Sequence, residues 1–393
     1  MHSHIITIKE IDDVNYALKE LNEQMSKIKL YKNTLGIVAV HPDFIDSGVY
    51  AAICDVLPFQ LVGIETFSQT VNNNTEMFLL SIMVLTSNTN EFSYENSQTS
   101  TNENEITTQA INCYQKAAKK LTGKPKLALL YTPFPEENYT GVACKCFRAI
   151  SETDKNLPIF GSLSCRELEM VTESKVVFGK EVSNNQFALV LISGDISPEF
   201  YVGSITEDVS VVSLIGVVTS SHNNLVKEIN GVNIKKFFNE MDFFIDKDIT
   251  STILSGIVVA EKKDENGNIL SRRTQGIMSL TDDDHALFGD HIEEGTVLSF
   301  AVLSEDVVIA TTDRLISQIK EHKNKTVLIY SCLSRWFASS LDKDRECNAL
   351  KNELSGSFNF QMAYSGGELC PASKKGETIH NAKHSASIIA CVF

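Results

Sequence analysis

A pattern that occurs three times constrains the fold of this chain most strongly. A segment with helical periodicity leads each time into a short apolar run: residues 11–28 into LGIVAVHP, residues 106–121 into KLALLYTPFP and residues 311–325 into TVLIYSCLSR. An apolar run without polar alternation predicts a strand that is buried on both faces. Three copies in the same order therefore indicate an internal structural repeat.

Each copy continues through a further helix to two more apolar runs. The second run ends in small or hydroxyl residues in FQLVGIETFS, LPIFGSLSC and FQMAYSGGELC, and the third is MFLLSIMVL, QFALVLISGD or HSASIIACVF. The repeated module is therefore helix, strand, helix, strand, strand. This order predicts an α/β protein of mixed α+β type, in which the modules form mixed sheets.

Two further regions depart from the repeat. Residues 201–306, between the second and third copies, contain turn signals at Asn230-Gly231 and Asn266-Gly267 and predict a mainly β insertion with one amphipathic helix. We accordingly expect two domains, 1–205 and 206–393. Residues 87–105 are almost wholly polar, and we expect a surface loop there because so few apolar side chains cannot offset the entropy of ordering.

Composition limits the partners and the compartment. The net charge of -15, without a basic stripe, argues against nucleic acid and anionic lipid. No apolar run approaches the roughly 18 residues that a membrane-spanning helix needs, and the first residues lack a secretion signal. The nine cysteines are scattered through apolar runs, as is typical of reduced thiols. We therefore expect a cytoplasmic protein without membrane insertion, whose partners are small molecules and proteins.

Two charged residues follow buried strands of the third module. Arg335 offers a fixed fork for a carboxylate and Glu368 an acceptor for an ammonium group, so together they suit a zwitterion if the two strands are neighbours. Gly366 and Gly367 would let backbone amides approach such a ligand. The alternative is structural: Arg335 and Glu368 form a salt bridge with each other, and the glycines serve a tight turn.

The residues of these strands resemble a known family. TVLIYSCLSR, MAYSGGELCP and ETIHNAKHSASIIACVF are similar to the C-terminal half of FIST-domain proteins, and KLALLYTPFP, LPIFGSLSC and QFALVLISGDI are similar to the N-terminal half. The resemblance implies that 1–205 is FIST N-like and 206–393 FIST C-like. It also implies an intracellular sensory protein that binds an amino acid or similar small polar ligand. Such a protein would signal to a separate partner, such as a histidine kinase.

We assign the candidate ligand contacts to the ends of the third module's strands. The candidates are Ser331, Cys332, Arg335, Tyr364, Ser365, Gly366, Gly367, Glu368 and Asn381. We expect no metal site, because His380 and His384 lie on a predicted strand, where four residues span roughly 13 Å. We also expect no catalysis.

Two alternatives remain open. One is a thiol-dependent or acid/base enzyme that uses Cys332, Cys370, Glu368 and His380, since a thiolate needs a neighbouring base or cation. The other follows from the resemblance, because some FIST proteins bind haem and sense nitric oxide. Haem needs one axial histidine in an apolar pocket, and no ligand is assigned. The candidate histidines are His222, His285, His291, His380 and His384.

Overall fold

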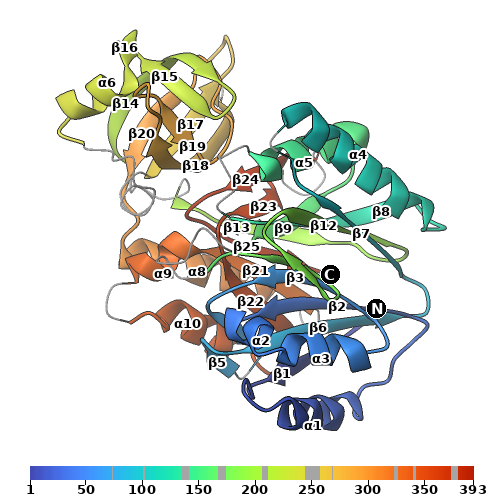
Figure 1. Ribbon diagram of the computed structural model, residues 1–393. Coiled ribbons are helices and arrows are strands. Elements are labelled where there is room, and N and C mark those ends of the chain that lie inside the picture. The colour runs from blue at the N-terminus through green and yellow to red at the C-terminus, as the bar shows by residue number, and fades with distance from the viewer. Residues whose placement is uncertain are drawn as a thin grey trace.

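Three α/β modules and a separate β-barrel make up the protein (Figure 1). The computed structural model describes residues 1–72, 74–100, 102–134, 141–166, 174–205, 211–243, 257–267, 269–322, 326–339, 342–372 and 379–393. Each module contributes most of one mixed six-stranded sheet, with a parallel pair of strands at its centre. The predicted mixed α/β fold class is confirmed, and the three predicted copies correspond to the three modules.

The first module spans residues 2–87. Its central strands β2 and β3 pair in parallel, β6 pairs antiparallel with β2, and β1 pairs with β6. The elements are β1 (His2–Ile8), α1 (Val14–Met25), β2 (Asn33–Val40), α2 (Pro42–Asp46), α3 (Val49–Val56), β3 (Gln60–Glu65), β4 (Gln69–Val71), β5 (Asn74–Glu76) and β6 (Leu80–Ser87).

The second module spans residues 91–193 and repeats this order. Strands β8 and β9 are the parallel pair, β12 pairs with β8, and β7 pairs with β12. The elements are β7 (Glu91–Gln98), α4 (Glu103–Lys119), β8 (Pro125–Thr132), α5 (Val142–Thr153), β9 (Ile159–Leu163), β10 (Val176–Phe178), β11 (Glu181–Ser183) and β12 (Gln186–Ser193).

The third module joins residues 199–203 to residues 305–392. Strands β21 and β22 are the parallel pair, β25 pairs with β21, and β13 pairs with β25. The elements are β13 (Glu199–Gly203), α8 (Glu305–Ile319), β21 (Thr326–Cys332), α9 (Leu333–Ala338), α10 (Arg345–Leu354), β22 (Asn359–Ser365), β23 (Glu368–Pro371), β24 (Asn381–His384) and β25 (Ile388–Val392).

The modules interlock through their hairpins. After its second parallel strand, each module sends a short hairpin into a neighbouring sheet: β4–β5 pairs with β22, β10–β11 with β3, and β23–β24 with β9. The exchange is cyclic, so each module both gives and receives one hairpin. The first and second modules are therefore held to the third by backbone hydrogen bonds as well as by side-chain packing.

The apolar core follows from this arrangement. The inner faces of the three sheets meet in one central cluster, to which each central strand contributes alternate residues, for example Ile37, Leu129 and Leu328. The outer faces are covered by helices: α1 to α3 on the first module, α4 and α5 on the second, and α8 and α10 on the third (Figure 1). Strands buried on both faces explain the continuous apolar runs in the sequence.

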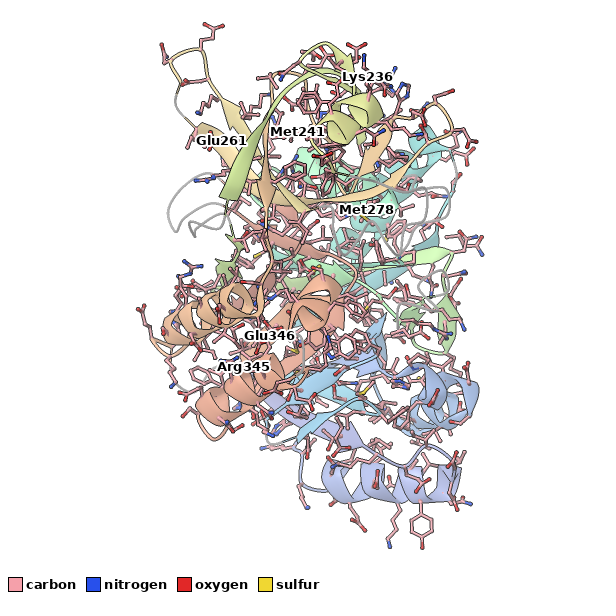
Figure 2. The ribbon with its side chains drawn as sticks, turned by 90° about the vertical axis from the view of Figure 1, so that its left-hand side faces the viewer. Lys236, Met241, Glu261, Met278, Arg345 and Glu346 are labelled. Carbon is pink, nitrogen blue, oxygen red and sulfur yellow. The ribbon has the colours of Figure 1, made fainter. Side chains whose placement is uncertain are left out.

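Residues 211–301 form the β-barrel between β13 and α8. Its strands follow the order β14, β20, β17, β18, β19, β15, and a β14–β15 pairing closes the ring. The elements are β14 (Val211–His222), β15 (Leu225–Ile229), β16 (Val232–Asn233), α6 (Ile234–Glu240), β17 (Ile257–Lys263), β18 (Ile269–Leu280), β19 (Ala286–Phe288) and β20 (Val297–Ala301). Lys236, Met241 and Glu261 lie on this barrel, away from the modules, in Figure 2.

Two sequence expectations need revision. The predicted surface loop over residues 87–105 is wrong, because residues 91–98 form edge strand β7 and α4 begins at Glu103. An edge strand is held by backbone hydrogen bonds on one side and faces water on the other, so its side chains remain largely polar. The division at residue 205 marks where the chain enters the barrel, but the exchanged hairpins cross it.

Candidate functional site

Strand alternation separates the predicted site residues into two groups. Successive side chains of a strand point to opposite faces, so Ser331 and Cys332 at the end of β21 face opposite sides of the sheet. On β22, Tyr364 packs in the outer cluster, whereas Ser365 lies on the inner side with Cys332. The nine predicted contacts therefore do not line one pocket.

The outer group is organised by a buried ion pair between Arg335 and Glu346. Both side chains have no exposed surface, and Arg335 Nη2 lies 2.6 Å from Glu346 Oε1. Arg335 Nε donates to the same oxygen at 3.0 Å, and Ser331 Oγ donates to Glu346 Oε2 at 2.6 Å. The guanidinium also donates to the hydroxyls of Thr311 and Thr312 on α8.

These contacts correct the prediction for Arg335. Its guanidinium neither salt-bridges Glu368 nor presents a vacant fork to a ligand carboxylate, because Glu346 and α8 take up the fork. Sequence reasoning missed Glu346, which lies on α10. The only sequence signal is an acidic residue beside Cys347 on the apolar face of that helix, where a buried carboxylate requires a cationic partner.

The inner group is centred on Glu368, the first residue of β23. Ser365 Oγ donates to Glu368 Oε1 at 2.6 Å, whereas Oε2 is buried and has no hydrogen-bond partner among the described residues. Burial raises the pKa of Glu368 to about 8, although hydrogen bonds from Ser365 and Cys332 and the more distant charges of Arg335 and Lys383 oppose this rise. The carboxyl group is therefore largely protonated at neutral pH.

Cys332 is the sulfur neighbour of this carboxyl group. Burial and the proximity of Glu368 raise the pKa of the Cys332 thiol to about 12, and Ser334 Oγ donates to its sulfur at 3.2 Å. A nucleophilic cysteine must ionise readily. Glu368 pairs with His384 at one end of the β23–β24 hairpin, whereas His380 precedes β24 at the other end. His380 is therefore too far away to act as a base for Cys332. This arrangement does not favour the thiol-dependent enzyme.

The space beside the two glycines of this group is filled by protein side chains. A Cβ atom on Gly366 would lie 2.4 Å from the ring of Phe134, so the ring packs directly on the glycine backbone. A Cβ atom on Gly367 would lie 3.3 Å from Lys383 Cε. Phe134 and Lys383 thus border the turn that leads into Glu368.

The segments that follow β3, β9 and β22 are hydrogen-bonded to one another beside Glu368. Thr66 Oγ1 donates to Tyr364 O at 2.9 Å, and Gly366 N donates to Leu163 O at 3.0 Å. A second buried ion pair, Arg166 with Glu65 at 2.7 Å, lies among these connections. Sequence reasoning missed this pair.

Asn381 has a structural role apart from both groups. Its Oδ1 accepts from Ile159 N at 2.8 Å, and its Nδ2 donates to Leu157 O at 2.9 Å. These bonds hold the start of β9 against the start of β24. The predicted contribution of Asn381 to a ligand site is therefore not supported by its position.

The candidate histidines do not fit a haem site. His222 and His380 are exposed, and His285 and His291 are partly exposed, whereas an axial ligand must point into an apolar pocket. His384 is buried, but its Nε2 lies 3.1 Å from Cys370 O, and burial lowers its pKa to about 4.

The described parts of the chain offer no metal-binding cluster and no membrane-spanning helix. Within them, no three His, Cys, Asp or Glu side chains gather as a metal ion would require. No helix among the described residues is long and apolar enough to span a bilayer. None of the nine cysteines forms a disulfide, and only Cys54 is not buried.

Comparison with known proteins identifies the family. No curated protein matches the chain. Among solved structures, a cyanuric acid hydrolase from A. caulinodans is similar at 7% identity and a TM-score of 0.38, covering 100% of this chain and 98% of that one. The FIST N domain matches residues 34–232 and the FIST C domain residues 246–371. FIST domains are small-ligand sensory domains of signalling proteins. With these two matches covering most of its length, this chain belongs to the FIST family.

Proposed function

We propose that this protein is a sensor of an amino acid or a similar small amine, and that Glu368 recognises the ligand's ammonium group. The observation that carries the proposal is the vacant oxygen of a fully buried carboxyl group, since Glu368 Oε2 has no hydrogen-bond partner among the described residues. Buried polar atoms are almost always paired, and an unpaired one is a candidate for ligand contact. An ammonium group would supply the missing donor.

The surroundings of Glu368 support this choice of ligand. Ser365 and Cys332 provide a hydroxyl and a thiol next to the carboxyl group, and the Gly366-Gly367 turn precedes it. Because the carboxyl group holds a proton at neutral pH, binding of a cation would expel that proton. Glu368 has no exposed surface. A ligand would therefore have to displace a covering side chain, for which Phe134 is well placed.

A contact between Lys383 and the barrel could transmit ligand binding at Glu368 to the barrel. Lys383 lies beside Gly367, and its Nζ donates to Gly289 O of the barrel at 2.6 Å. Asp290, next in the chain, is buried and pairs with Arg148 of α5 at 3.2 Å and with Arg273 of the barrel at 2.5 Å. A ligand cation would repel Lys383 and weaken this contact. The altered barrel position would be read by a separate signalling protein, such as a histidine kinase.

Thermal denaturation with a panel of amino acids and small amines tests the proposal. A ligand at about 100 times its dissociation constant adds about 2.7 kcal/mol to the stability of the form that binds it. We expect at least one panel member to stabilise the wild type and the Glu265→Gln control, whose substitution lies on an exposed barrel hairpin. Glu368→Gln should lose the effect. Equal stabilisation of Glu368→Gln would exclude Glu368 as the recognition group.

A further inference from the structure

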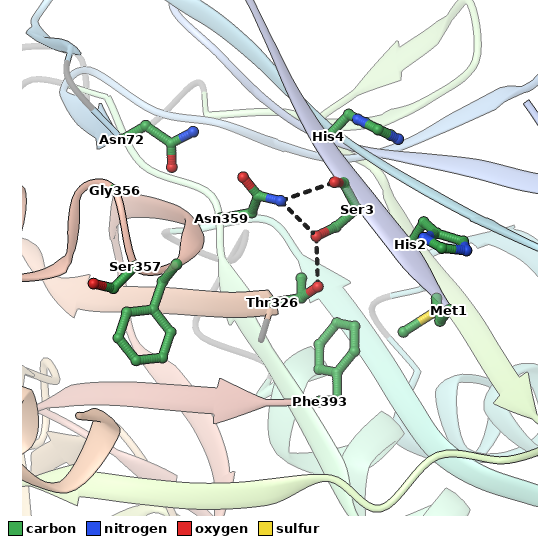
Figure 3. A pocket seen from close by; sticks show the side chains of 11 residues that line it. Met1, His2, Ser3, His4, Asn72, Thr326, Gly356, Ser357, Asn359 and Phe393 are labelled. Atoms are coloured by element: carbon green, nitrogen blue, oxygen red, sulfur yellow. Dashed lines mark hydrogen bonds between the residues drawn. The ribbon is translucent and has the colours of Figure 1, made fainter. Parts of the chain in front are cut away.

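A cavity lies at the ends of the strands opposite to Glu368. It has a volume of about 650 Å³ and lies between the first residues of β1, the β4–β5 turn and the amino ends of β21 and β22. Figure 3 shows its lining, which includes the amides of Asn72 and Asn359 and the ring of Phe393. We refer to it as the amino-end cavity. Its volume suits a small organic molecule.

In each side-chain amide one polar atom is hydrogen-bonded to the protein, and this determines whether the other atom is a donor or an acceptor. Asn72 Oδ1 accepts from the backbone nitrogen of Phe360 at 3.1 Å, so its Nδ2 is left as a donor. Asn359 Nδ2 donates to Ser3 O at 2.9 Å and to Ser3 Oγ at 3.2 Å, so its Oδ1 is left as an acceptor. A backbone N–H can only donate and a carbonyl can only accept, so neither amide can be reversed without losing a bond.

The two amides are neighbours, because Asn72 bonds to the residue that follows Asn359. In Figure 3 the amide oxygen of Asn359 is turned toward the side of the cavity on which Asn72 lies. Neither the vacant nitrogen of Asn72 nor the vacant oxygen of Asn359 has a hydrogen-bond partner among the described residues. Thr326 Oγ1 donates to Ser3 Oγ at 2.6 Å and so fixes the residue that holds Asn359.

The remaining lining favours a planar molecule that can stack on an aromatic ring. No Asp, Glu, Lys or Arg side chain is among the described residues that line the cavity, and the rings of Phe358 and Phe393 do line it. Burial and the nearby His2 lower the pKa of His4, which favours a neutral imidazole there. Aromatic faces stack on planar rings, and a side-chain amide pairs with the edge of a nucleobase through one donor and one acceptor.

We propose that the amino-end cavity binds a nucleobase or nucleoside, whose edge pairs with the Asn72 donor and the Asn359 acceptor. Another cavity, between β2, β3 and β7, lacks this arrangement of donor and acceptor among its described lining residues. It measures about 420 Å³ and is lined by Lys32, and the amide of its Asn33 donates to Asn90 O at 2.8 Å. The paired donor and acceptor are thus a feature of the amino-end cavity rather than of every junction between modules.

Titration calorimetry of the full-length protein with adenosine, guanosine, cytidine and uridine tests the inference. We expect at least one of them to bind. Asn72→Asp keeps the acceptor for Phe360 N but removes the donor, and aspartate tolerates the positive φ of 40° at this position. We expect this variant to unfold at the wild-type temperature and to bind at least about tenfold more weakly. The matched control is Asn239→Asp, an exposed residue of α6, which should bind like the wild type.

A ligand pair tests the recognised edge itself. If adenosine binds, N6,N6-dimethyladenosine should bind at least about tenfold more weakly, because it lacks the N–H that Asn359 Oδ1 would accept. Absence of binding by all four nucleosides would overturn the inference, and so would wild-type affinity in Asn72→Asp. Glu368→Gln should bind the nucleoside normally, so failure here is distinguishable from failure of the proposed sensor function.

Discussion

The buried carboxyl group of Glu368 predicts an unusual dependence of stability on pH. Its pKa is about 8 in the folded protein against a usual value of 4.5, so the folded state keeps a proton that the unfolded state has lost between these limits. Stability from this group is fully present below pH 4.5 and is lost as pH rises toward and through 8. From pH 6.5 to 8 the loss amounts to roughly 1–2 kcal/mol, since each pH unit is worth at most about 1.4 kcal/mol.

Glu368→Gln removes the titrating group while its side-chain oxygen can still accept from Ser365. Urea unfolding of wild type and variant at several pH values, followed by the fluorescence of the single tryptophan, Trp336, measures the difference. Trp336 packs against Phe67, so it reports on the module body rather than on the barrel. The free energy of unfolding of the variant relative to wild type should rise by roughly 1–2 kcal/mol from pH 6.5 to 8. Parallel pH profiles would refute the reasoning. The window avoids His384, whose lowered pKa makes stability fall as pH drops from 6.5 toward 4.

Three other changes have defined outcomes. Glu346→Ala should cost about 3–5 kcal/mol in urea unfolding, because it leaves Arg335 buried without its carboxylate; a loss below about 1 kcal/mol would show that the pair is dispensable. Deletion of Glu91–Gln98 should lower the melting temperature and promote aggregation on gel filtration, because it exposes the edge of β12; an unchanged monomer would contradict the assigned strand. Asp290→Asn should increase hydrogen exchange in α5 and β24, since it weakens the ion pair with Arg148 that holds the barrel against α5. Unchanged exchange there would argue against this ion pair as the contact that ligand binding weakens.

The repeat could be predicted from the sequence because its central strands are buried on both faces. Such strands form continuous apolar runs, and the third module showed them as clearly as the first. The exchanged hairpins could not be predicted. Strands β4 and β10 are three residues long, too short to show a periodicity, and their partners lie in other modules. The sequence of strand β7 is as polar as that of a loop, because an edge strand needs little apolar surface.

The candidate site was predicted only in part, for a geometric reason. Cys332 and Ser365 end β21 and β22, Glu368 follows β22 after the glycine turn, and these three residues meet. Alternation along the strand then sends Ser331 and Tyr364 to the other face. Arg335 could not be matched with its partner, because the sequence offered several acidic residues and the fold selects Glu346 on a helix.

Proton release on ligand binding tests the role of Glu368 most directly. The amino acid or amine that gives the largest thermal shift is titrated into the protein at pH 6.5 in buffers of different ionisation enthalpy. We expect the wild type to release nearly one proton per ligand at pH 6.5 and about half a proton in the same titration at pH 8, with affinity rising between the two. Glu368→Gln should release none. Tight binding by the wild type without proton release would contradict recognition of the ligand's ammonium group by this carboxyl.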